Sequence, residues 1–248
     1  MLNNPKLRLG ASLWLLAMSG VVVVVLTMLP QLLTKAPQQV PLSVALTASM
    51  VQSGVLLAVA VWAGVSLGKP LGLGAPVIEA ALTRCGPWLP LRRQCVPAAV
   101  AGAVVGIQLV LSPSIAPPEV TNAAHTVNIS VAAKVLYGGI TEEVLMRWGL
   151  MTAMIWLPWR VWQRKSGTPK PAFVLSAIVL TAVLFGVSHL PAAVAMGIPL
   201  TAPVISYIVV GNTLPGVLFG ALYWRRGIEA AMVAHALGHV IATGAAGV

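Results

Sequence analysis

Long apolar stretches separated by short polar segments dominate the hydrophobic pattern of this chain. Seven can be read, at residues 11–33, 41–68, 98–116, 131–159, 172–190, 201–224 and 228–246. Each is close to or longer than the roughly 20 residues with which an α-helix crosses a bilayer. The runs are continuous rather than alternating, which excludes a transmembrane β-barrel. The pattern therefore predicts an all-α, polytopic transmembrane helix bundle of seven to eight spans.

The composition agrees with this pattern. Of the 248 residues, 58% are hydrophobic and only 8% are charged, whereas an ordinary soluble domain has roughly 25% charged residues. No segment outside the apolar stretches is long enough to bury a soluble core of its own. We expect residues 1–248 to form a single integral membrane domain, with N-terminal helices at 1–130 that carry no motif and a motif-bearing core at 131–246. The first stretch is too long for a signal peptide, which predicts a retained helix.

The formal net charge is +10, but the cations lie between the apolar stretches and form no basic face for nucleic acid. They lie in every second segment between the apolar stretches of the seven-span arrangement and therefore on one side of the membrane, which marks those segments as cytosolic and places the N-terminus inside. We expect a multi-pass integral membrane protein. Its short, compact chain is typical of bacterial proteins and favours a location in the bacterial plasma membrane. Cys85 and Cys95 share the longest basic loop and should be free thiols in a reducing compartment. The cations concerned are Lys6, Arg8, Lys69, Arg84, Arg92, Arg93, Arg160, Arg164, Lys165, Lys170, Arg225 and Arg226.

The chain has 5 acidic residues, and all of them are glutamates. An aspartyl protease needs two aspartates that share a proton, so this mechanism is excluded. Glu79 and Glu119 fall in expected loops, and Glu229 falls at an expected helix start, where a negative charge is favourable. These three residues need no functional explanation.

Glu142 and Glu143 lie inside an apolar stretch, where each charged group costs on the order of 2.5 to 3.5 kcal/mol. On a helix, Glu143 and Arg147 are four residues apart on one face, which predicts an internal ion pair. Glu142 points about 100° away and remains free to enter a polar cavity. One carboxylate is thus expected to be structural and the other available for chemistry.

Three histidines lie in apolar stretches and can meet such a carboxylate. His235 and His239 are four residues apart and share a helix face, while His189 lies on another helix. Ala236 occupies the position of the glutamate in an HExxH zinc motif, so a carboxylate would have to come from another helix. We expect Glu142, His189 and His235 to converge in one polar network. His125 is an expected loop residue.

Three segments in order then carry a family resemblance: "EEVLMR" from Glu142, "FGVSH" from Phe185 to His189, and "HALGH" from His235. They fit EExxxR, FxxxH and the HxxxN or HxxxD position of the CAAX protease and bacteriocin-processing family, also called the Abi family. The chain thus resembles intramembrane endopeptidases related to the type II CAAX prenyl protease. The resemblance implies that Glu142 and His189 activate a water while His235 and His239 stabilise the oxyanion. Glu143, Arg147 and Phe185 would support the site.

His239 departs from the family pattern, because it stands where the family has asparagine or aspartate. A histidine is a better metal ligand than an asparagine amide. Glu142, His189, His235 and His239 would be the ligand set and base of a catalytic zinc, if one is bound. The sequence leaves open whether the water is activated by glutamate alone or on a metal.

The expected partners are the lipid bilayer and a membrane-associated peptide or protein substrate, for which a prenylated tail is one candidate. Two other functions stay open. Glutamate, arginine and histidine at mid-membrane also form proton relays, so a proton-coupled transporter is one alternative, although no inverted repeat is visible. The other is a catalytically silent bacteriocin-immunity or scaffold protein, which the resemblance also implies.

Overall fold

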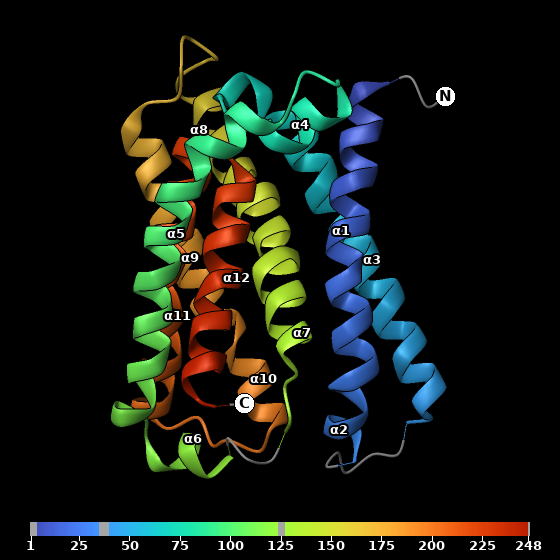
Figure 1. Ribbon diagram of the computed structural model, residues 1–248, viewed down its shortest axis with the longest axis vertical. Coiled ribbons are helices and arrows are strands. Elements are labelled where there is room, and N and C mark those ends of the chain that lie inside the picture. Colours follow the sequence, from blue (N-terminus) through green and yellow to red (C-terminus); the bar gives the residue numbers. More distant parts are fainter. Residues whose placement is uncertain (1–3, 35–39, 124–126, 248) are drawn as a thin grey trace.

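The computed structural model describes residues 4–34, 40–123 and 127–247, and within these ranges every regular element is a helix (Figure 1). The all-α fold class is confirmed. Lys35 and His125 lie outside the described residues. In the described part, 6 helices are long and apolar enough to cross a membrane, close to the seven to eight spans that the sequence predicts.

Five of these spans follow the predicted stretches closely. They comprise α1 (Pro5–Thr27) with α2 (Leu29–Leu33), α3 (Leu42–Leu67), α9 (Pro171–Ser188), α11 (Ala202–Arg226) and α12 (Ile228–Ala245). The sixth, α5 (Trp88–Leu111), begins ten residues before the expected position and continues through Pro97. The shorter elements are η1 (Lys69–Leu71), α4 (Pro76–Leu82), η2 (Ser112–Ile115), α6 (Pro118–Ala123) and α10 (Leu190–Ala195).

The stretch predicted at 131–159 is a continuous helical run but is not among the six apolar spans. It consists of α7 (Val131–Ala133), η3 (Lys134–Glu142), η4 (Val144–Met151) and α8 (Thr152–Val161). Both η3 and η4 are π-helical, a form with i→i+5 hydrogen bonds that is rare and often occurs at functional sites. The motif glutamates therefore lie on an unusual helix.

Close helix contacts hold this run in the bundle. Thr141 donates a hydrogen bond to the Ala17 carbonyl of α1 at 2.6 Å. On its other side, a Cβ atom at Gly139 would lie 2.8 Å from the Ala236 Cβ of α12, closer than side chains approach. Small residues at such positions let membrane helices pack backbone against backbone. The run is thereby fixed between α1 and α12.

The segment 69–97, which the sequence predicts as a loop, is largely helical. Glu79 lies in the first turn of α4, and Glu119 likewise belongs to a short helix, α6. Glu229 is buried, and its Oε1 atom accepts hydrogen bonds from the backbone N–H groups of Val77 and Ile78, each at 2.9 Å. It therefore caps α4 from a distant helix, where the sequence suggests only a favourable charge at the start of its own helix.

Orientation in the membrane can be tested with the free thiols, since Cys85 is exposed in the turn after α4. In a Cys95→Ser background, we expect an impermeant maleimide to label Cys85 in inverted vesicles and not in intact cells. Ser114→Cys, introduced at the opposite end of α5 in a Cys85→Ser/Cys95→Ser background, should show the reverse pattern. Labelling of Cys85 from outside the cell would reject a cytosolic N-terminus.

Candidate active site

A buried ion network lies where η3 and η4 meet α12. Arg147 Nη1 lies 3.2 Å from Glu143 Oε1, and both side chains are fully buried. The same carboxylate oxygen accepts a hydrogen bond from His235 Nδ1 at 2.8 Å. Arg147 Nη2 also donates to the Gly216 carbonyl of α11 at 3.2 Å. The expected Glu143–Arg147 pair is present, and it joins three helices.

Aromatic rings enclose the arginine of this network. The guanidinium carbon of Arg147 lies 4.6 Å from the ring centroid of Phe185 and 5.5 Å from that of Phe219. Such cation–π contacts are stronger in a site without water. Phe185, which the motif predicts to support the site, therefore contacts the network directly.

Glu142 has different surroundings from Glu143, although the two are neighbours in sequence. Its side chain is 19% exposed, and its two oxygens lie 4.0 Å from His189 Nε2 and 4.0 Å from His235 Nε2, respectively. These distances are too long for direct hydrogen bonds and short enough for a bridging water. The structure thus brings Glu142, His189 and His235 together, and the nearby Arg147 is occupied by Glu143.

Hydrogen bonds at Nδ1 fix the orientation of the imidazole rings of His189 and His235. His189 Nδ1 lies 2.8 Å from the Phe185 carbonyl oxygen, and because a carbonyl only accepts, this nitrogen carries the proton. His235 Nδ1 likewise donates to Glu143. In the neutral rings, each Nε2 is then an acceptor directed at Glu142. Three hydrogen-bond acceptors therefore converge, namely the Glu142 carboxylate and the two Nε2 atoms. A water molecule can donate to two of them at once.

His239 lies farther from the carboxylate than the other two histidines. Its ring stacks on His235 with centroids 5.1 Å apart, and no ion contact to Glu142 is found for it within the described residues. A Cβ atom at Gly138 would lie 2.9 Å from His239 Nε2 and 3.5 Å from His235 Nε2. The two imidazoles of "HALGH" thus share the side of η3 that carries Gly138.

Two residues that shape this arrangement escape sequence reasoning. Phe219 stacks on the His235 ring with centroids 4.5 Å apart, and Gly138 leaves room for His239. Gly138 lies four residues before Glu142, so helix spacing could have placed it on the site. No signal within α11 marks Phe219 among the other apolar residues.

The positions of Glu142, His189 and His235 can be compared with those that the ligands of a metal ion require. The Nε2 lone pairs of His189 and His235, together with the Glu142 carboxylate, are donors that zinc accepts. Among the residues that the structure describes, however, no group of three or more His, Cys, Asp or Glu side chains is close enough to hold an ion. As placed, these residues do not fit a metal centre.

Because Glu143 belongs to the buried network, we expect its substitution to lower the stability of the folded protein. Glu143→Gln leaves Arg147 buried without its counter-charge, a change that costs about 3 to 5 kcal/mol. Adding Arg147→Met should restore most of this loss, because the orphaned charge is removed. The measurement is thermal unfolding in detergent, with Glu119→Gln as control. Equal unfolding midpoints for Glu143→Gln and the control would contradict the account.

Residues 124–241 match the family model described as type II CAAX prenyl endopeptidase Rce1-like. No curated protein and no solved structure matches significantly. The matched segment contains all three motifs and every residue of the site. Residues 124–241 of this integral membrane protein thus match the Rce1-like family of CAAX-type membrane proteases, as the motifs indicate.

Proposed function

We propose that the protein is an intramembrane endopeptidase that hydrolyses a peptide bond of a membrane-associated protein or peptide with a water activated by Glu142. The observation that carries this proposal is the position of the Glu142 carboxylate, 4.0 Å from Nε2 of both His189 and His235. The family match supports proteolysis. It favours neither a transporter nor a silent scaffold.

In this mechanism Glu142 is the general base. A water held between Glu142 and His189 Nε2 gives its proton to the carboxylate while its oxygen attacks the scissile carbonyl carbon. The C–N bond then breaks, and Glu142 returns the proton to the leaving amine. The proton that Glu142 takes from water thus leaves with the amine, and the carboxylate is regenerated after each peptide bond is cleaved.

The oxyanion that forms on the carbonyl needs a hydrogen-bond donor. No hydrogen-bond partner of His239 is found within the described part of the chain, so a ring N–H is free to donate. Removing one such donor typically costs 10²- to 10³-fold in turnover.

Fixing His235 is, in this proposal, the task of the buried network. Glu143 holds its Nδ1, and the ring is stacked between Phe219 and His239. A general base works only when its partners stay within hydrogen-bond reach. Glu143 and Arg147 are therefore positioning residues, not catalytic ones.

The assignment predicts a large loss of activity for two single variants. Glu142→Gln keeps the shape of the side chain but removes the base, and general acid–base catalysis is worth roughly 10²- to 10⁴-fold in rate. His189→Ala should reduce turnover by a similar factor. The assay offers the purified full chain a prenylated CAAX peptide, its unprenylated form and a set of membrane-anchored peptides, with Glu119→Gln as the matched control. Unchanged cleavage by Glu142→Gln would reject the site.

Metal dependence is a separate prediction. Since the described residues do not fit a metal centre, we expect preparations with full turnover to contain less than stoichiometric zinc by elemental analysis. Treatment with a chelator followed by its removal should leave the rate unchanged. Loss of turnover on chelation, with recovery on adding zinc, would instead establish a metalloprotease.

A further inference from the structure

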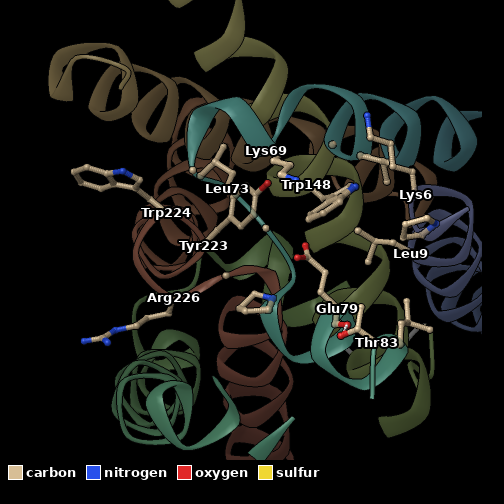
Figure 2. A pocket seen from close by; sticks show the side chains of 18 of the residues that line it. Lys6, Leu9, Lys69, Leu73, Glu79, Thr83, Trp148, Tyr223, Trp224 and Arg226 are labelled. Atoms are coloured by element: carbon tan, nitrogen blue, oxygen red, sulfur yellow. Dashed lines mark hydrogen bonds between the residues drawn. The ribbon is translucent and has the colours of Figure 1, made fainter. Parts of the chain in front are cut away.

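A cavity lies at the end of the bundle opposite to α6 and α10, and none of the motif glutamates or histidines lines it. Its volume is about 570 Å³. It is bounded by the start of α1, the end of α3 with η1, α4, and the junction of α11 with α12 (Figure 2). No step of the proposed hydrolysis uses it.

The deeper walls of the cavity are apolar and aromatic. Trp148 and Tyr223 are buried there, and their polar atoms already have partners. Trp148 Nε1 donates to the Val61 carbonyl at 3.3 Å, and the Tyr223 hydroxyl lies 2.8 Å from Thr152 Oγ1. These walls therefore offer apolar surface rather than hydrogen bonds to an occupant.

The rim is strongly cationic. Four cations are among the residues that line the cavity, against a single carboxylate, that of Glu79; Figure 2 shows Glu79 pointing toward the middle of the cavity and Arg226 pointing away from it. The cations are Lys6, Lys69, Arg225 and Arg226. Among the described residues, none of the four forms an ion pair within 4.0 Å. The cavity thus presents an uncompensated positive charge above an apolar floor.

We propose that this cavity binds the phosphate-bearing headgroup of an anionic membrane phospholipid. Basic pockets between transmembrane helices are suited to such headgroups, because they supply the counter-charge at the membrane surface. The apolar walls would receive the glycerol and upper acyl region, which a soluble phosphate lacks. The occupant would rest against Trp148, the residue that follows Arg147 of the buried network.

The test measures lipid binding to the full-length protein in detergent, by the shift of its unfolding midpoint. Phosphatidylglycerol is compared with phosphatidylcholine of the same acyl chains and with inorganic phosphate. We expect the wild-type protein to bind phosphatidylglycerol more tightly than phosphatidylcholine. Each cation contributes about fivefold to such binding, so Lys69→Gln should weaken it about fivefold and Lys6→Gln/Lys69→Gln about 25-fold.

Two further variants make the test specific for the cavity. Glu79→Gln removes the opposing charge but keeps an oxygen that can accept the hydrogen bond from Ala75 N–H, so it should tighten phosphatidylglycerol binding. Lys165→Gln removes an exposed cation outside the cavity and should leave binding unchanged. Equal affinity for the two lipids, or equal losses for Lys69→Gln and Lys165→Gln, would overturn the proposal. Stabilisation by inorganic phosphate as large as that by the lipid would also overturn it, in favour of a soluble anion.

Discussion

The buried contact among Glu143, Arg147 and His235 is the interaction on which the rest of the site depends. A charged group in the bilayer interior is stable only when it is paired or hydrogen-bonded. Here one carboxylate oxygen serves both the guanidinium and the imidazole. The arginine reaches α11 through the Gly216 carbonyl. Helices from the middle and the end of the chain are thereby joined at a single polar point.

This pairing also determines what Glu142 can do. Because Arg147 is held by Glu143, Glu142 faces two imidazole acceptors and no cation within 4.0 Å in the described part of the chain. It remains partly exposed, whereas Glu143 is fully buried. Adjacent residues of the same type thus occupy a structural and an open position, and their helical offset is what separates them. The proposed chemistry rests on this division.

Local rules of sequence predict much of this arrangement. Apolar length predicts the spans, four-residue spacing predicts the Glu143–Arg147 pair, and the scarcity of polar groups predicts that Glu142 meets His189 and His235. The stacking of Phe219 on His235 could not be predicted, because an apolar residue on α11 carries no mark of its partner on another helix. The same holds for Glu229, whose hydrogen bonds join residues more than 150 positions apart in sequence. Packing between distant helices decides both.

In the proposed function, the gap between Glu142 and His189 is where the peptide bond is cleaved. The most direct measurement is a structure of the Glu142→Gln variant bound to an uncleaved substrate peptide. We predict that the scissile carbonyl carbon lies where a water between position 142 and His189 Nε2 could attack it from about 3 to 3.5 Å. A peptide whose scissile bond lies away from these two residues, for instance against α4 and the end of α11, would contradict the account.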